Sequence, residues 1–287
     1  MSKPSFVSAG YLRSLIKNAL QEDIGPGDIT SLATLPSDYK TSAVLKVKEA
    51  GILAGMEVAK AVFSRVDPGL KFIPHLKDGD GIMPGKIAFT VKGKARSIIT
   101  AERLVLNIMQ RMSGIATLTR KYVAECEVTK AKVLDTRKTS PGLRVLEKWA
   151  VKIGGGNNHR MGLYDMVLIK DNHIDVNGGV EAVLEKAREY LRKKNRKVPI
   201  VLEVRNKEEI ERALAIGIAN RLLLDNFSPA ELKKAVAFIN KRVETEASGG
   251  INLKNIRKYA ATGVDFISVG ALTHSATSLD LSLKISR

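Results

Sequence analysis

The chain has 287 residues, of which 44% are hydrophobic, so it is long enough for one large core or two modest ones. No apolar run approaches the roughly 20 residues that cross a bilayer, and the N-terminus has no apolar signal-peptide core, so we expect no membrane partner and no secretion. Cys126 is the single cysteine, which excludes an internal disulfide and favours a reducing, cytoplasmic location. The formal charge of +17 suits nucleic acid, an acidic membrane surface or small anionic substrates.

The distribution of the positive charge favours small anions. The densest basic run, RKKNRK (192–197), lies between a helical pattern and an apolar strand pattern and is expected to be a solvated loop. Aromatic residues make up only 5% of the chain and do not alternate with the basic ones, which argues against a surface that stacks bases. Many other basic residues stand singly at the ends of apolar segments. We therefore expect anionic small molecules as substrates and no nucleic-acid partner.

The first 115 residues predict a separate α+β domain. A helix is expected near residues 10–22, followed by the turn EDIGPGDIT and by short alternating strands in TSAVLKVKEAG and KIAFTVKGKAR. Residues 99–126 have the pattern of a long amphipathic helix that is broken at Ser113–Gly114 and links this domain to the rest.

From residue 131 onward, strand and helix patterns alternate. Six apolar segments end in polar or glycine residues, at intervals of 22 to 35 positions: AKVLDTRK, DMVLIKDNH, VPIVLEVRN, RLLLDNFS, VETEASGG and VDFISVG. Helical patterns such as EAVLEKAREYLRKK lie between most of them. This alternation predicts βα units around a parallel sheet that is buried on both faces. An α/β barrel of fewer than eight strands fits best, and a doubly wound open sheet is the alternative.

The predicted domain limits follow from this change of pattern. We expect the N-terminal domain with the linking helix at residues 1–115 and the barrel at residues 116–273. The C-terminal segment, residues 274–287, is expected to pack back on the N-terminal domain.

The residues that follow the strands predict the site, because the carboxyl ends of parallel strands meet at one edge. Glycine loops after the last two strands favour a phosphate site. Arginines and a histidine suit a ligand with two carboxylates, whereas lysines suit phosphates. The residues collected there, with two from the stretch KIGGGNNHR (152–160), are Arg137, Lys138, His159, Arg160, Lys170, Glu203, Asp225, Ser248, Gly249, Gly250 and Gly270.

Glu203 and Asp225 end apolar strands and face the expected cationic pocket. As permanent anions they suit magnesium, held through phosphate or water, or a sugar cation; a pair of structural ion pairs is the alternative. Neighbouring cations oppose the raised pKa that a general acid would need. The four histidines lack zinc spacing, and the standard dinucleotide, P-loop and nucleophile-elbow patterns are absent from the sequence.

The strings DTRKT, GGGNNHRMGLYDMVLIKDNH, LEV, LLLDN, EASGGI and DFISVGALTHSA closely resemble the quinolinate phosphoribosyltransferase (nicotinate-nucleotide pyrophosphorylase, carboxylating) family of type II phosphoribosyltransferases. With EDIGPGDIT and ITAERLVLNIMQRMSGIAT, the resemblance covers essentially the whole chain. It implies an N-terminal α/β sandwich and an open α/β barrel of about seven strands. It also implies a pentosyltransferase that converts quinolinate and 5-phosphoribosyl 1-diphosphate, with Mg²⁺, to nicotinate mononucleotide, CO₂ and pyrophosphate in NAD biosynthesis.

The same resemblance implies roles for individual residues. The glycines of KIGGGNNHR would let the chain approach the ligand closely. Arg103 would reach into the site of a partner subunit, which implies a homodimer or a higher oligomer. The roles by class are quinolinate binding for Arg103, Arg137, His159 and Arg160, catalysis for Lys138, Lys170, Glu203 and Asp225, and phosphate binding for Ser248, Gly249, Gly250, Gly270 and His274.

Magnesium would be held by Glu203 and Asp225, mostly through substrate and water. Two alternative functions stay open. One is a related transferase of the same fold, either the molybdate-transport-associated paralogue or a nicotinate-using enzyme. The other is a nucleic-acid-binding protein that uses the net charge of +17.

Overall fold

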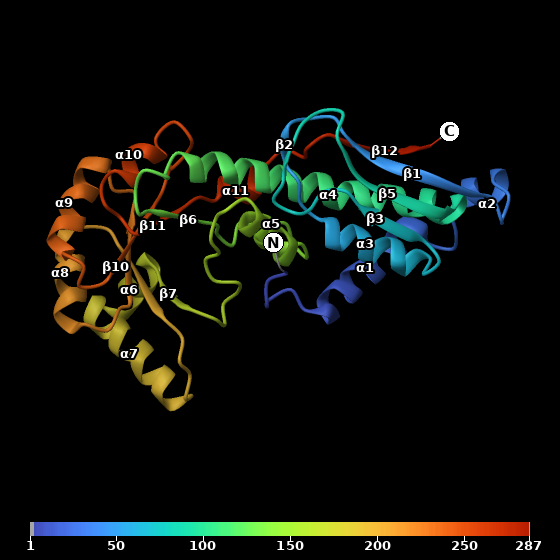
Figure 1. The fold of residues 1–287 in the computed structure, drawn as a ribbon. Helices are drawn as coiled ribbons and strands as arrows, with labels where there is room; N and C mark the ends of the chain where they lie inside the picture. Colours follow the sequence, from blue (N-terminus) through green and yellow to red (C-terminus); the bar gives the residue numbers. More distant parts are fainter. Residues whose placement is uncertain (1–2, 287) are drawn as a thin grey trace. The chain divides into compact units, whose positions relative to one another are not determined.

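The computed structural model describes residues 3–286, and their contacts divide the chain into two compact units (Figure 1). Among the described residues, the first unit comprises residues 3–120, 139–155 and 272–286, and the second comprises residues 121–138 and 156–271. The expected boundary at residue 115 falls inside one helix. Residues 139–155, which we expected in the barrel, pack with the first unit, because the Glu147 carboxylate binds Arg111 and the Tyr11 hydroxyl binds the Gly142 carbonyl oxygen.

Within its described residues, the first unit is built on an antiparallel sheet in the order β12–β1–β5–β3. Alternate side chains of β1, among them Leu45 and Val47, are fully buried, so one face of the sheet lies on the core. The C-terminal strand pairs with β1 and places Leu283 opposite Leu45. The strands of this unit are β1 (Lys40–Val47), β2 (Gly51–Ile52), β3 (Lys71–Pro74), β4 (Gly81–Ile82), β5 (Ile87–Lys94) and β12 (Leu281–Ile285).

Helices of the first unit cover this core. Phe63 of α3 packs on Phe72 and Phe89 of the sheet, with ring centroids 6.1 Å and 5.8 Å away. The α/β character that the sequence predicts is thereby confirmed for this unit. Its helices are α1 (Ala9–Ile24), α2 (Ile29–Thr34), α3 (Met56–Val66), most of α4 (Ala95–Ala124) and α5 (Arg144–Ile153).

Helix α4 runs for 30 residues without interruption, so the break expected at Ser113–Gly114 was wrong. The small residues are there for close packing. The Ser113 hydroxyl accepts the Ala54 N–H at 2.9 Å, and a Cβ at Gly114 would lie 1.9 Å from the Thr277 carbonyl oxygen.

The glycine run after α5 also has a packing cause. A Cβ at Gly154 would lie 2.5 Å from the carbonyl oxygen of Ala116 and 2.6 Å from the Cβ of Thr119, both on α4. Gly155 has a φ of +94°, in the region that favours glycine. Gly154 therefore lets α5 end against α4, while the close approach of a ligand to these glycines stays a prediction.

The second unit, whose residues are all described, contains a six-stranded parallel sheet in the order β6–β11–β10–β9–β8–β7. A parallel bridge joins Leu134 to Asn157, where a seventh strand would lie. From β7 to β11 the order follows the chain without the reversal of a doubly wound sheet, which favours the open barrel. The strands are β6 (Lys132–Leu134), β7 (Val167–Ile169), β8 (Ile200–Val204), β9 (Arg221–Asp225), β10 (Glu244–Ser248) and β11 (Phe266–Ser268).

Helices follow the strands of the second unit, as the alternating pattern predicts (Figure 1). Asn206 and Ser228 cap α8 and α9 by accepting backbone N–H groups. The run RKKNRK begins in the last turn of α7 and continues as an exposed loop. Within residues 3–286, no helix is both long and apolar enough to cross a bilayer. The helices are α6 (Asp171–Asn177), α7 (Val180–Lys193), α8 (Lys207–Ile216), α9 (Pro229–Ile239), α10 (Ile256–Ala260) and α11 (Ala271–His274), the last continuing into the first unit.

Candidate active site

One face of the parallel sheet carries most of the predicted strand-end residues. Residues that are aligned in parallel strands share a face, and so do residues two apart in one strand. The register aligns Asp225 of β9 with Ser248 of β10, and the β8–β9 pairing puts Glu203 on the same face. The same alternation, carried through β7 and β11, adds Lys170 and Gly270. The structure therefore brings these five residues to one edge of one face.

Lys170 and Glu203 form the closest charged pair at this edge. Their Nζ and Oε2 atoms lie 3.8 Å apart, and the Glu203 side chain is only 12% exposed. Burial raises the pKa of Glu203 above its usual value, Lys170 lowers it, and the nearby carboxylates of Asp225 and Asp171 raise it further. Burial and the neighbouring carboxylates thus oppose the charged form of Glu203, and an additional cation at this edge would favour that form.

These carboxylates face a hollow of about 850 Å³ in the second unit. Asp171, Glu203 and Asp225 lie in its lining, and the Asn226 amide donates a hydrogen bond of 2.6 Å to Asp225 Oδ2. Asp171 was not singled out from the sequence, although it directly follows Lys170 in the string IKDNH and begins α6. Its position next to a predicted lysine was the signal that could have identified it.

The loop after β10 needs glycine at Gly249. Its φ is +95°, and a Cβ there would lie 2.1 Å from the Asn226 side-chain oxygen. The Asn226 backbone N–H in turn donates to the Ser248 carbonyl oxygen at 2.9 Å, and the Asn255 amide donates to the Gly250 carbonyl oxygen at 3.0 Å. The predicted phosphate loop and the loop that follows Asp225 are thus locked together.

Two predicted carboxylate-binding residues, Arg137 and Arg160, lie near each other. Burial lowers the pKa of the Arg160 guanidinium, the charge of Arg137 lowers it further, and Asp165 partly offsets both. Arg137 and Lys138 are exposed, and the Lys138 N–H donates to the Thr136 hydroxyl at 3.0 Å. A ligand with negative charge would relieve the repulsion between the two guanidinium groups.

His159 is placed differently from an exposed ligand-binding side chain. Its Nδ1 accepts the backbone N–H of Arg160 at 2.8 Å, and its Nε2 lies 3.4 Å from Oε1 of Glu246. The His159 side chain is 7% exposed and that of Glu246 is fully buried. Sequence reasoning missed Glu246, although the alternation of β10 places it on the same face as Ser248.

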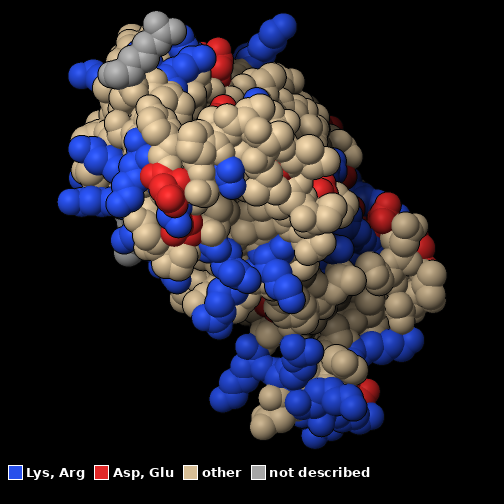
Figure 2. All heavy atoms as spheres, turned by 90° about the vertical axis from the view of Figure 1, so that its right-hand side faces the viewer, with Lys and Arg blue, Asp and Glu red and all other residues tan. Residues whose placement is uncertain are grey.

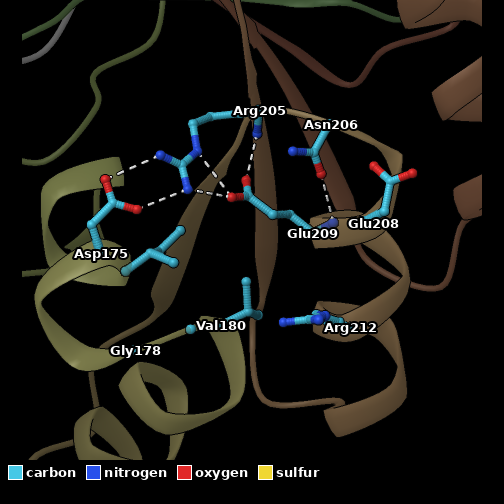
Figure 3. A pocket seen from close by; sticks show the side chains of 10 residues that line it. Asp175, Gly178, Val180, Arg205, Asn206, Glu208, Glu209 and Arg212 are labelled. Carbon is cyan, nitrogen blue, oxygen red and sulfur yellow. Dashed lines mark hydrogen bonds and ion pairs between the residues drawn. The ribbon is translucent and has the colours of Figure 1, made fainter.

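Arg205 follows β8 but has a structural role (Figure 3). Its guanidinium lies between the carboxylates of Asp175 and Glu209, with hydrogen bonds of 3.0 Å and 2.6 Å from one nitrogen. A hollow of about 470 Å³ lies beside this cluster. Asp175 belongs to α6, the helix that begins directly after Lys170, and Glu209 belongs to α8. Arg205 therefore connects these two helices.

The remaining two predicted site residues, Arg103 and His274, belong to the first unit. Arg103 is exposed on α4. His274 is exposed at the end of α11, and its Nδ1 lies 2.7 Å from the Ser275 hydroxyl.

A protein-only metal cage is absent from residues 3–286, where no three His, Cys, Asp or Glu side chains are arranged to hold an ion. The carboxylates of Glu203 and Asp225 are nevertheless the oxygen ligands that Mg²⁺ prefers, and both line the same hollow. This donor set suits an ion whose other ligands are water and substrate oxygens.

Comparison with known proteins agrees with this arrangement. Family models described as quinolinate phosphoribosyl transferase, N-terminal domain and C-terminal domain, match residues 28–113 and 115–284. The chain is 48% identical over 289 residues to the chloroplastic nicotinate-nucleotide pyrophosphorylase (carboxylating) of Arabidopsis thaliana, covering 96% of this chain and 82% of that protein. It is 41% identical to a probable nicotinate-nucleotide pyrophosphorylase (carboxylating) of Bacillus subtilis, covering 96% and 93%.

The fold agrees as well. The crystal structure of NadC from Streptococcus pyogenes superimposes with a TM-score of 0.94 at 36% sequence identity, covering 99% of both chains. Both domains of the family thus match in sequence, and the whole chain matches in fold. The chain therefore belongs to the quinolinate phosphoribosyltransferase family.

Proposed function

We propose that this chain transfers the phosphoribosyl group of 5-phosphoribosyl 1-diphosphate to quinolinate, with decarboxylation, giving nicotinate mononucleotide, CO₂ and pyrophosphate for NAD biosynthesis. The observation that carries the proposal is the joint placement of Lys170, Glu203, Asp225 and Ser248 on one face at the carboxyl edge of the sheet. The printed names of the relatives describe the same carboxylating and decarboxylating chemistry.

Quinolinate binding is assigned to the neighbouring guanidinium groups of Arg137 and Arg160. Quinolinate has two adjacent carboxylates, and each arginine can bind one carboxylate with two parallel hydrogen bonds. Burial and, after it, the charge of Arg137 lower the pKa of Arg160, and the repulsion between the two guanidinium groups is relieved when the dianion enters. A ligand with one carboxylate would leave one partly buried cation without compensation.

The transfer step is assigned to the two strand-end carboxylates. The pyridine nitrogen attacks C1 of the ribose while the bond from C1 to the pyrophosphate oxygen breaks, so positive charge grows on the ribose. Glu203 and Asp225 stabilise that charge from fixed positions on rigid strands. Magnesium bound to pyrophosphate oxygens would supply charge neutralisation for the leaving group.

Decarboxylation follows on the ribosylated ring. The bond from C2 to its carboxylate breaks, and the electron pair left at C2 is stabilised by the adjacent cationic ring nitrogen until a proton replaces CO₂. We assign Lys138 to the stabilisation of that carbanion and Lys170, 3.8 Å from Glu203, to the pyrophosphate and the reacting ring.

The 5-phosphate is assigned to the loops after the last two strands. Positive φ angles of Gly249 and Gly250 support this assignment, because such turns expose consecutive backbone N–H groups to an anion. Ser248 and Gly270 belong to the same edge of the sheet. His274 is assigned to the phosphate as well.

The assembly that we propose is a homodimer, or a higher oligomer built from dimers, in which Arg103 of one subunit completes the partner's quinolinate site. The exposure of Arg103 on α4 supports this proposal. We also propose a cytoplasmic location. It is supported by the buried, single Cys126, since burial raises the pKa of its thiol to about 11 and keeps it unreactive.

A nucleic-acid-binding function is not favoured on the face that Figure 2 shows. Its lysine and arginine side chains form separate groups with uncharged surface between them, rather than one continuous band. Duplex DNA should accordingly bind only weakly, and tight duplex binding with a steep dependence on salt would instead favour the nucleic-acid-binding function.

One assay tests the proposed function. Purified protein is incubated with Mg²⁺, 5-phosphoribosyl 1-diphosphate and either quinolinate or nicotinate, and nicotinate mononucleotide and CO₂ are measured. We expect product and equimolar CO₂ with quinolinate, and loss of turnover when Mg²⁺ is chelated. Absence of turnover with quinolinate, or equal turnover of nicotinate, would contradict the proposal.

A further inference from the structure

We infer that a buried chain of contacts from Arg221 through Glu246 and His159 holds the peptide N–H of Arg160, and that His159 is a positioning residue rather than a direct ligand of the substrate. The inference rests on the proposed function for the role of Arg160. It concerns the geometry of the loop that carries this arginine into the site.

The hydrogen bonds of the His159 ring define its tautomer. Nδ1 accepts the N–H of Arg160 at 2.8 Å, so Nδ1 must present a lone pair. The ring proton therefore lies on Nε2, which faces the Glu246 carboxylate at 3.4 Å. With both nitrogens engaged and the side chain 7% exposed, the ring has no donor directed at a pyridine carboxylate.

Glu246 is a fully buried carboxylate in the interior of the barrel. It accepts hydrogen bonds from Arg221 Nη1 at 2.9 Å and from the Ser268 hydroxyl. Burial acts to raise its pKa, but the hydrogen bonds from His159, Ser268 and Arg221 outweigh burial and leave the pKa below its usual value. The carboxylate is thus a stable anion that can orient an imidazole Nε2–H.

The backbone beside His159 is held from the other side as well. Buried Asp135 accepts the His159 N–H at 2.9 Å and the Asn158 amide at 2.6 Å. The His159 backbone is therefore fixed by Asp135 and the next peptide by the His159 ring. Together these two hydrogen bonds fix the backbone position from which the Arg160 side chain extends. This position matters because a small misplacement of a substrate-binding group lowers activity greatly.

The first measurement is the tautomer itself. Protein labelled with ¹⁵N-histidine has four imidazoles, and His159 is assigned by its loss in His159→Asn. We expect ¹⁵N–¹H correlations with a proton on Nε2 and none on Nδ1, both in the free protein and with saturating quinolinate. A proton on Nδ1 in the free protein would refute the hydrogen bond from Arg160, and a ring proton that moves when quinolinate binds would show direct contact with the ligand; either result would overturn the inference.

The second measurement is the kinetic effect of Glu246→Gln. We expect the KM for quinolinate to rise about tenfold, as for one weakened charge-assisted hydrogen bond, with the KM for 5-phosphoribosyl 1-diphosphate within about twofold. The matched control is Glu244→Gln, which removes an exposed charge that is bonded to the same Arg221 at 2.8 Å and lies two residues before Glu246 on β10. An unchanged KM for quinolinate in folded Glu246→Gln, or an equal rise in the control, would contradict the inference.

The two proposals fail in different ways. If wild-type protein does not bind quinolinate, the proposed function is wrong, whereas the tautomer in the free protein still tests the anchoring of Arg160. If Glu246→Gln does not fold, the wild-type spectra decide.

Discussion

Gly249→Ala should destabilise the protein by more than its backbone conformation alone requires. An alanine at a φ of +95° carries the strain of the left-handed region, roughly 1–2 kcal/mol. The new Cβ would also lie 2.1 Å from Asn226 Oδ1 and 2.9 Å from the Asn226 backbone nitrogen, so Asn226 must move. Overpacking of this kind costs about 1–3 kcal/mol more. The free energy of unfolding should therefore fall by about 2–5 kcal/mol.

Gly217→Ala is the matched control, because Gly217 has a φ of +64° at the end of α8 and open space around its Cβ position. Its cost should be the backbone strain alone, roughly 1–2 kcal/mol. Urea unfolding followed by circular dichroism measures both variants. In Gly249→Ala the kcat should also fall, because Asn226 holds Asp225 by a hydrogen bond of 2.6 Å. Equal stability losses in the two variants would refute the reasoning that contact with Asn226 requires glycine at this position.

Three further predictions concern the proposed site. Arg160→Lys keeps the positive charge but loses the bidentate guanidinium, so it should lower the kcat/KM for quinolinate about 10-fold to 100-fold and reduce the enzyme's preference for quinolinate over nicotinate. Steady-state kinetics with both acids measure this, and an unchanged preference would contradict it. Mixed Arg103→Ala and Lys170→Ala proteins, each inactive alone, should regain activity after subunit exchange, and no recovery in tagged, verified heterodimers would argue against a shared site. Glu203→Gln should lower kcat about 10²-fold to 10³-fold. It should also raise the melting temperature at neutral pH. The pKa of Glu203 is higher in the folded than in the unfolded protein, so the wild type loses stability as the pH rises from the unfolded pKa through the folded pKa. Melting curves from pH 3 to 8 test the sign, and a gain that grew at low pH would be inconsistent with it.

The sequence by itself was sufficient for the α/β class and for the edge of the sheet at which the candidate site residues gather. Apolar strands ending in Lys170, Glu203 and Asp225 predicted a parallel sheet with polar residues at its carboxyl end, because both faces of such a sheet are buried and its ends are exposed. Period-two alternation in β10 also contained the signal for Glu246, which lies two residues before Ser248.

Other features depended on tertiary contacts that no local pattern shows. Ser113–Gly114 has the composition of a helix break, but α4 continues because the small residues pack against Ala54 and Thr277. Residues 139–155 belong to the first unit, and not to the barrel as expected, because their side chains and backbone contact residues of that unit that are distant in the sequence.

The contrast is sharpest at His159. As a residue type beside an arginine it predicted a ligand contact, since composition records which groups are available but not what they face. The fold turns its ring toward Glu246, 87 positions further along the chain, and toward the N–H of Arg160. Local sequence determines where a functional side chain is attached, whereas burial and long-range hydrogen bonds decide which of its atoms are left for a substrate.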